Sequence, residues 1–346
     1  MRLQDIYTQP GERRVIRTAL ACLALGMGFL AGCQGSSLPA ERPTLAVLPF
    51  EARDAREETR DLADHLTKRF RTILATGAEV RVTESGSAMH PSLAGLSLAE
   101  KAQILGADYL LAGTLGRKEG RLRLALQVLD TSGEERWHET FESPLLYQAQ
   151  LQEWALEALW PQLPLDAQGL EVAKGLVAHC HYPDDAMAIL TLARTGRRGG
   201  GPASLAMVAT ADIEAGLLHL AQSEFYFRQL ETLPEPQQPV IERLAVRSLG
   251  RAAASCPEHP DVELLRLLNT GELPLTAENA ARYLARHPNS ADLYLAVAEF
   301  YAAAASDRQA RAHAREAALL DPLGEATRCR ASALLEQAGD ASLECP

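Results

Sequence analysis

Two short strings of histidine, cysteine and aspartate are the residues of this chain best suited to binding a metal ion. They are HCHYPDD, from His179 to Asp185, and CPEHPD, from Cys256 to Asp261. Two thiolates and two or three imidazoles could complete a tetrahedral zinc site. Neither string has the short Cys-x-x-Cys spacing typical of such sites, and both follow predicted helix ends, where His, Pro and Asp are common loop residues. We therefore predict no metal site, and a metal-dependent envelope hydrolase is the weakest of the alternatives.

Motifs for covalent catalysis and phosphate binding are also weak. A serine nucleophile would need a Gly-x-Ser-x-Gly elbow, which neither GSSLP nor ESGSA provides. GTLG, from Gly113 to Gly116, lacks the spacing and the lysine of a phosphate-binding loop, and the glycine-rich GRRGGGPAS follows no predicted strand. We predict that the chain is not an enzyme, has no catalytic residues and uses no cofactor.

The segment before Cys33 has the features of a bacterial export signal. Basic residues precede an uncharged run, TALACLALGMGFL, which is well short of the roughly 20 apolar residues of a membrane-spanning helix. The end of this run resembles the lipobox of bacterial lipoproteins, in which small residues fit the signal peptidase and the cysteine thiol is lipidated. A general secretory signal with an incidental cysteine is the alternative. The lipobox residues are Leu30, Ala31, Gly32 and Cys33.

The lipobox implies a periplasmic protein that is anchored in a membrane through its N-terminus. Residues 1–32 would be removed as the signal peptide, and Cys33 would carry acyl chains such as palmitate. Several chains hold stably, because one chain alone binds a membrane only marginally. Gln34 stands where an aspartate would resemble the inner-membrane retention signal, so we expect the periplasmic face of the outer membrane. Residues 33–43 are polar, contain Pro and Gly, and are predicted to form a tether.

Four cysteines remain once the cysteine of the signal peptide and Cys33 are set aside. An even number in an oxidising compartment suggests two disulfides, for which three pairings exist. We favour Cys180–Cys256 and Cys329–Cys345, since the second would hold a C-terminus that has little else to fix it. Unpaired structural cysteines remain an alternative, as does a zinc site at the first pair.

The charge balance argues against nucleic acid as a partner. The chain has 34 Lys+Arg and 45 Asp+Glu, and residues 1–32 contain four of the basic and two of the acidic residues. The remainder therefore has 30 basic and 43 acidic residues, a net charge of −13. We find no basic stripe in the sequence that would neutralise phosphates. A length of 346 residues predicts two domains.

Residues 44–163 alternate between strand and helix patterns. An apolar run begins at Thr44 and is broken by Pro49, which predicts a buried strand, and DLADHLTKRFRTIL repeats apolar residues at helical spacing. AEVRVTES alternates like a half-buried strand, with Arg81 on the polar side. A helix that ends at Gly106 and a closing helix at 145–160 are also expected. Runs at 109–115, 121–130 and 134–143 predict a three-stranded antiparallel meander, in which Trp137 faces the core and His138 faces solvent.

These segments together resemble the TolB amino-terminal-like domain, which in related form occurs in outer-membrane lipoproteins that activate peptidoglycan synthases. The resemblance covers Thr44 to about Leu163. It implies a mixed sheet with helices on one side and a protein-binding role, and it implies no catalytic residues. The residues that carry it best are Leu48-Pro49-Phe50, Leu105-Gly106-Ala107-Asp108-Tyr109, Gly113, Asp130, Gly133 and Trp137.

Residues 164–346 lose the strand patterns and become rich in alanine and leucine. The segment 291–322 resembles a tetratricopeptide (TPR) repeat, because it predicts two helices with small facing residues and because Pro288 precedes Pro322 by 34 residues. The match is partial for 261–288, and a capping helix follows Pro322. The TPR signature residues are Tyr294, Val297, Ala298, Tyr301, Ala310, Ala317 and Pro322.

The predicted fold class is α+β, with a mixed α/β sandwich followed by an all-α TPR-like solenoid of three to four hairpins. A concave solenoid surface suits a partner protein, so we expect a lipid-anchored periplasmic adaptor that binds proteins of the cell envelope. One alternative is a structural component of an envelope secretion, polysaccharide-export or peptidoglycan-synthesis assembly. A helical bundle with a supporting role alone is the alternative to the solenoid.

Overall fold

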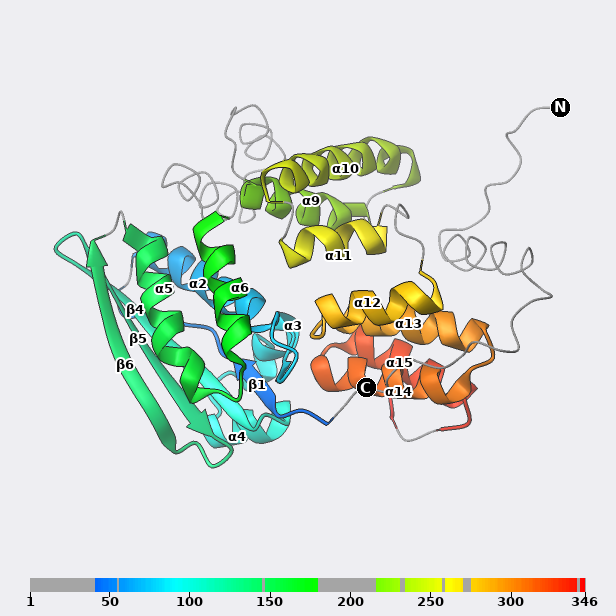
Figure 1. Ribbon diagram of the computed structural model, residues 1–346, viewed down its shortest axis with the longest axis horizontal. Helices are drawn as coiled ribbons and strands as arrows, with labels where there is room; N and C mark the ends of the chain where they lie inside the picture. Colours follow the sequence, from blue (N-terminus) through cyan, green and yellow to red (C-terminus); the bar gives the residue numbers. More distant parts are fainter. Residues whose placement is uncertain are drawn as a thin grey trace.

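The computed structural model consists of an α/β domain and a helical region that lie against each other (Figure 1). The structure describes residues 41–54, 56–144, 147–179, 216–230, 234–256, 259–269, 275–340 and 343–345.

A six-stranded mixed sheet forms the centre of the α/β domain, in the order β3-β1-β4-β5-β6, with β2 paired to β4. β1 runs parallel to both β3 and β4, and β4, β5 and β6 form an antiparallel meander. The meander predicted from the sequence is therefore confirmed. The strands are β1 (Thr44–Val47), β2 (Glu51–Ala52), β3 (Arg81–Val82), β4 (Tyr109–Lys118), β5 (Arg121–Asp130) and β6 (Glu135–Pro144).

Two tight turns set the register of the meander. Glu119 and Gly120, between β4 and β5, both have positive φ, as a two-residue hairpin turn requires. Between β5 and β6, the Asp130 carboxylate accepts hydrogen bonds from the main-chain N–H of Ser132 and of Glu134, and Gly133 has a φ of 80°. Asp130 and Gly133 thus shape the turn between β5 and β6.

One face of the sheet packs against α2 (Glu57–Leu74), α5 (Gln148–Leu159) and α6 (Ala167–His179). Alternate residues of β5, such as Leu124 and Leu126, point into this layer. Gly113 is needed here, because a Cβ at this position would lie 2.7 Å from Cδ1 of Phe50. Trp137 packs at the border of the same core, and His138 is exposed, as predicted.

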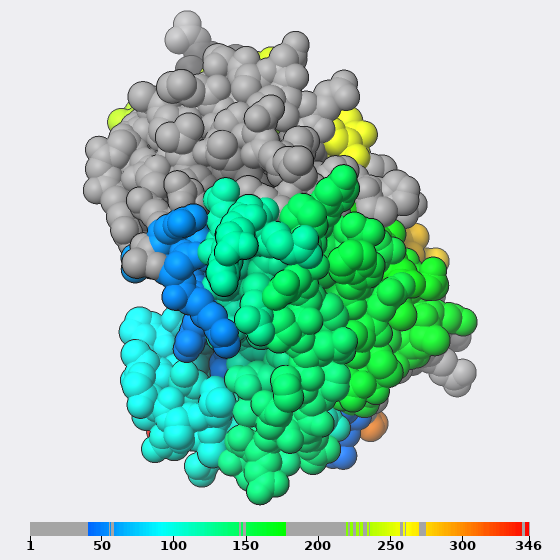
Figure 2. Space-filling view, turned by 90° about the vertical axis from the view of Figure 1, so that its left-hand side faces the viewer, coloured from blue at the N-terminus to red at the C-terminus, as the bar shows by residue number. Residues whose placement is uncertain are grey.

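The second face of the sheet also carries helices, which corrects the expectation of helices on one side only. Ala46, Leu48, Leu110 and Leu129 are buried on this face beneath α3 (Ser85–Ala88), a short 3-10 turn at Pro91–Leu93, and α4 (Leu98–Leu105). Figure 2 shows the teal meander between the cyan α3–α4 segment and the green α5 and α6. Apolar residues on both sides of β1 and β4 require this second cover. A capping box of Ser97 and Glu100 starts α4, and Gly106 at φ 59° ends it.

The helical region contains two groups of helices. α9 (Gly216–Leu230) and α10 (Gln238–Ser255) pack side by side and are followed by α11 (Pro260–Asn269). The second group packs around alanines of α14, which let the neighbouring helices approach closely. The helical C-terminal region predicted from the sequence is thus present. The helices of the second group are α12 (Ala277–Arg286), α13 (Ala291–Ala303), α14 (Asp307–Leu320) and α15 (Glu325–Gln337).

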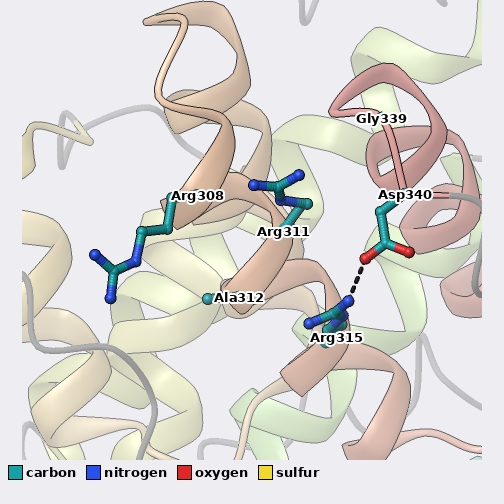
Figure 3. Close-up of a pocket in the computed structure, with 6 residues that line it drawn as sticks. All are labelled: Arg308, Arg311, Ala312, Arg315, Gly339 and Asp340. Atoms are coloured by element: carbon teal, nitrogen blue, oxygen red, sulfur yellow. Dashed lines mark hydrogen bonds and ion pairs between the residues drawn. The ribbon is translucent and has the colours of Figure 1, made fainter.

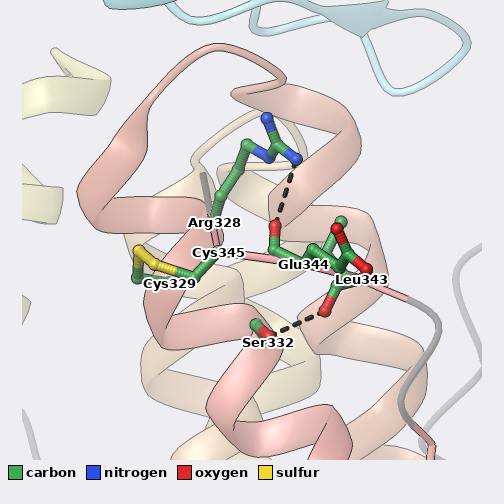
Figure 4. Close-up of a disulfide and its surroundings, with 6 residues drawn as sticks. All are labelled: Arg328, Cys329, Ser332, Leu343, Glu344 and Cys345. Atoms are coloured by element: carbon green, nitrogen blue, oxygen red, sulfur yellow. Dashed lines mark hydrogen bonds between the residues drawn. A yellow bond between two sulfur atoms is a disulfide. The ribbon is translucent and has the colours of Figure 1, made fainter.

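A disulfide between Cys329 and Cys345 holds the C-terminal segment against α15 (Figure 4). The Arg328 guanidinium donates to the Glu344 carbonyl at 3.1 Å, and the Ser332 hydroxyl donates to the Leu343 carbonyl at 2.7 Å. This pairing is consistent with the second of the two predicted disulfides.

Candidate functional site

A buried ionic cluster joins the α/β domain to the helical region. Glu316 on α14 accepts hydrogen bonds from Nη2 of Arg42 at 2.6 Å and from Nε and Nη2 of Arg81 at 3.0 and 2.9 Å. The side chains of Glu316, Arg42 and Arg81 are 4%, 9% and 10% exposed. We call these three residues the Glu316 cluster. They come from three distant parts of the chain, namely the segment before β1, strand β3 and helix α14.

Both arginines of the Glu316 cluster are also anchored outside it. Arg42 donates from Nη2 to the Pro288 carbonyl at 3.0 Å, and Arg81 donates from Nη1 to the Thr44 hydroxyl at 3.1 Å. Burial alone would raise the pKa of Glu316, but the hydrogen bonds and charges of Arg81 and Arg42 outweigh it and hold this pKa below its usual value. Glu316 is therefore an anion at neutral pH.

The Glu316 cluster changes two details predicted from the sequence. Arg42 falls within the predicted tether at 33–43, yet the structure packs its side chain between the two regions. Arg81 was expected on the wet side of a half-buried strand, but it is 8% exposed. The expectation was wrong because alternation shows only which residues of a strand are polar. It does not show that Arg81 is buried in an ion pair with a carboxylate 235 residues away in the sequence.

Asn289 covers the edge of the sheet next to this cluster. Its Oδ1 accepts from the Val82 N–H at 2.8 Å, and its Nδ2 donates to the Ala75 and Gly77 carbonyls, both at 2.9 Å. β3 is an edge strand, whose main chain would otherwise have unpaired groups. Asn289, which precedes α13, therefore gives one N–H of this edge strand a partner and also binds the turn after α2.

The end of α14 and the loop that follows it make a second set of contacts with the α/β domain. The Ser87 hydroxyl donates to Asp321 at 2.6 Å and accepts from the Leu323 N–H at 2.8 Å. The Glu84 N–H donates to the Leu320 carbonyl at 2.7 Å. These bonds, Asn289 and the Glu316 cluster form the junction. Because the junction includes side chains and main chain from both regions, α13–α15 are fixed against the α/β domain.

The predicted TPR signature residues lie inside the helical packing rather than on a surface. Their small and aromatic side chains fill the space between α13 and α14, so their role in this structure is to hold the helices together. Pro322 lies in the turn after α14, as predicted. The residues buried between the helices are Tyr294, Val297, Ala298, Tyr301, Ala310 and Ala317.

His313 is a buried titratable residue that our sequence reasoning missed. Its ring stacks on Tyr301, with centroids 5.6 Å apart, and lies 5.8 Å from the ring of Tyr294. Its Nδ1 has no hydrogen-bond partner among the described residues. Burial lowers the pKa of His313 to about 4, against a smaller opposing effect of Glu316. The signal for it was its spacing, three residues after Ala310 and four before Ala317 on the buried face.

The predicted attachment and metal-like residues fall largely outside the described ranges. Cys33, the rest of the lipobox, Cys180 and His181 all lie there. Cys256 is described and is 4% exposed. Within the described ranges, no three His, Cys, Asp or Glu side chains are arranged to hold a metal ion. None of the helices in these ranges is long and apolar enough to cross a membrane.

Two outward-facing surfaces of the second helix group are candidates for binding. The first, the α13–α15 face, includes exposed Asp292, Glu299 and Ala333 and the partly buried Ala296 and Arg330. Glu299 and Arg330 form an ion pair across it at 2.6 Å. Small and charged residues therefore alternate on this surface.

The second surface is a pocket of about 460 Å³ between α14 and the end of α15 (Figure 3). Arg308 and Arg311 diverge around Ala312, and Arg315 points toward Asp340, with which it pairs. We call Arg308, Arg311 and Arg315 the arginine stripe. The sequence search for a basic stripe missed it because the three residues are separated by others and converge only when wound on a helix.

Comparison with known proteins gives partial likenesses. No protein-family profile and no curated protein sequence matches the chain. Among solved structures, TolB from Acinetobacter baumannii aligns with 16% identity and a TM-score of 0.28, over 37% of this chain and 30% of its own. The LpoB C-terminal domain from Salmonella enterica aligns with 18% identity and a TM-score of 0.23, over 32% of this chain and 88% of its own. The chain thus spans less than a third of the TolB chain.

Proposed function

We propose that this protein is a non-enzymatic adaptor, held on the periplasmic face of the outer membrane by lipid on Cys33. In this proposal the helical region binds a partner protein of the cell envelope through a TPR-like surface. The observation that carries the proposal is the Glu316 cluster, which fixes the helical region on the α/β domain. An adaptor must hold its partner in a defined position, and a buried ionic cluster specifies one arrangement of the two regions.

The tether reaches the junction directly. Arg42 is the next-to-last residue of the predicted tether and a member of the Glu316 cluster. From Cys33 to Arg42 the chain can span at most about 30 Å when fully extended. A partner on the α13–α15 face would therefore be held at a restricted distance from the membrane, without a long flexible linker between anchor and binding surface.

The α13–α15 face has the chemistry of a peptide-binding surface. Ala296 and Ala333 leave room for a partner's side chains, and Asp292, Glu299 and Arg330 offer both signs of charge. Stacked helices bind extended or helical segments on surfaces of this kind. The partner that fits it is a peptide segment with charges of both signs.

The anchor is tested by replacing the lipidation cysteine. We expect wild-type protein in the outer-membrane fraction and the mature form of Cys33→Ser in the soluble periplasmic fraction, because serine lacks the thiol that receives lipid. The measurement is cell fractionation followed by immunoblotting. Cys22→Ser is the matched control, since it changes a cysteine of the signal peptide and leaves the lipobox intact. Mature Cys33→Ser protein, without residues 1–32, that stays with the membranes would refute the lipid anchor.

The binding surface is tested by site-specific cross-linking in living cells. A photoreactive residue at Ala333 is expected to give one discrete cross-linked envelope protein, and Glu299→Lys is expected to weaken that product severalfold. The same probe at Ala254, an exposed alanine on α10, is the matched control. Identical products from both positions, or none from Ala333, would count against a partner on this face.

A further inference from the structure

We propose that the arginine stripe on α14 binds the headgroups of anionic phospholipids in the membrane that carries the lipid anchor. The proposal rests on the anchor at Cys33 for its geometry. It adds a second, non-covalent contact that sets which side of the protein faces the bilayer.

The arginine stripe lies on the outward face of an amphipathic helix. Residues 308, 311 and 315 are spaced by three and four, so they share one side of α14, opposite the buried Ala310, Ala314 and Ala317. Leu319 follows one turn after Arg315 and is 50% exposed. A helix face with arginines and an exposed aliphatic residue suits the boundary between headgroups and acyl chains.

The pocket is chemically suited to a phosphate diester. Arg311 is steadied by a hydrogen bond from Nη1 to the Ala338 carbonyl at 2.9 Å, and Arg315 pairs with Asp340. Arg308 is exposed and forms no ion pair with any residue in the described part of the chain. Guanidinium groups bind phosphate oxygens through two parallel hydrogen bonds. With one carboxylate against three guanidiniums, the pocket keeps a positive charge.

The positive charge of the pocket stands out because the chain as a whole is negatively charged. The part that follows the signal segment carries a net charge of −13, so an anionic bilayer repels the protein as a whole. Basic residues close to such a surface are attracted to it within a Debye length. The arginine stripe therefore selects an orientation that the lipid anchor alone leaves open.

The stripe also lies on the helix that the tether contacts. Arg42 hydrogen-bonds to Glu316, which is the next residue after Arg315 on α14. The stripe spans about 10 Å along the helix. With at most about 30 Å of chain between Cys33 and Arg42, the membrane surface is within reach of this face.

Vesicle sedimentation tests the proposal with the chain from residue 33 onward carrying Cys33→Ser, so that no lipid contributes. We expect binding to phosphatidylcholine vesicles that contain phosphatidylglycerol, little binding to phosphatidylcholine alone, and weaker binding at high salt. The triple variant Arg308→Gln, Arg311→Gln, Arg315→Gln is expected to lose roughly tenfold or more in vesicle affinity. Arg308→Gln alone should weaken binding severalfold, and it removes no ion pair within the described part of the chain. Asp340→Asn should strengthen binding, because it removes the opposing charge.

The matched control is Arg243→Gln, Arg247→Gln, Arg251→Gln, which changes the net charge equally on the exposed face of α10. This control should bind like the parent. Wild-type binding by the α14 triple variant, or equal loss in the α10 variant, would overturn the proposal. Tighter binding to polyglutamate than to the anionic vesicles would overturn it in favour of an acidic protein ligand. Since the assay uses unlipidated protein, failure of the anchor at Cys33 would leave its outcome unchanged.

Discussion

Glu316→Ala is expected to lower the free energy of unfolding by about 3–5 kcal/mol, because it leaves the guanidinium groups of Arg42 and Arg81 buried without their carboxylate. Urea denaturation at neutral pH measures the loss. We also expect faster limited proteolysis between the two regions, since the Glu316 cluster joins them. Glu299→Ala is the matched control. It removes an exposed ion pair with Arg330 and should cost less than about 1 kcal/mol.

The pH dependence of the free energy of unfolding is a second measurement that tests the role of Glu316. The folded-state pKa of Glu316 lies below its usual value, so the stabilisation is present above the pKa of the unfolded chain, about 4.3. It is lost as pH falls through the lower folded-state pKa. Glu316→Ala should therefore flatten the acidic limb of the stability curve. A loss no larger than that of Glu299→Ala would show that the cluster contributes little to the junction.

In the wild type, we expect His313 to lower the free energy of unfolding by about 3 kcal/mol as the pH falls from about 6.5 to 4. His313→Phe is expected to remove this loss. In the folded protein His313 is neutral down to about pH 4, because burial penalises its charged form. The unfolded chain takes up the proton near pH 6.5, so acidification favours unfolding across this interval. Phenylalanine keeps the stacking on Tyr301 and has no Nδ1 to leave without a partner.

The measurement is the free energy of unfolding of both proteins from pH 7.5 to pH 4. At the upper end the two should agree within about 1.5 kcal/mol, because the swap is similar in shape. Within the described part of the chain, Glu316 is the ionisable side chain that acts on His313; it opposes the effect of burial and is retained in the variant. His138→Phe, at an exposed position, should keep the wild-type slope. Equal slopes for wild type and His313→Phe would contradict the prediction.

Local patterns predicted the parts of the fold whose causes are local. The meander could be read from alternation in β5 and from the turn chemistry of Asp130 and Gly133, and the start and end of α4 from Ser97 and Gly106. The second helical layer was also present in the sequence, because Ala46 and Leu48 alternate with Leu45 and Val47 in an unbroken apolar run. A strand that is apolar on both sides is buried on both faces. The resemblance to the TolB amino-terminal-like domain led us to expect helices on one side of the sheet only.

The junction could not be predicted in the same way, because its causes are distant in sequence. Asn289 is of a type common next to helix starts, and Glu316 is of a type common on solvated helix faces. No neighbouring residue in the sequence distinguishes either of them from other polar residues. Their partners Val82 and Arg81 lie more than 200 residues earlier. The arginine stripe was missed for a different reason, since a composition search for basic runs does not follow helical spacing.

Arg42 also determines how mechanical load would pass into the protein. A pull on the chain before Arg42 first strains the bonds of its guanidinium to Glu316 and to the Pro288 carbonyl. Two residues later the chain enters β1, which lies between two parallel neighbours, β3 and β4, so further tension would shear this strand along their hydrogen bonds. Shearing requires several bonds to break together, whereas peeling an edge strand breaks them one at a time. If the protein is anchored as proposed, tension from the membrane would thus be resisted at β1, in the centre of the sheet.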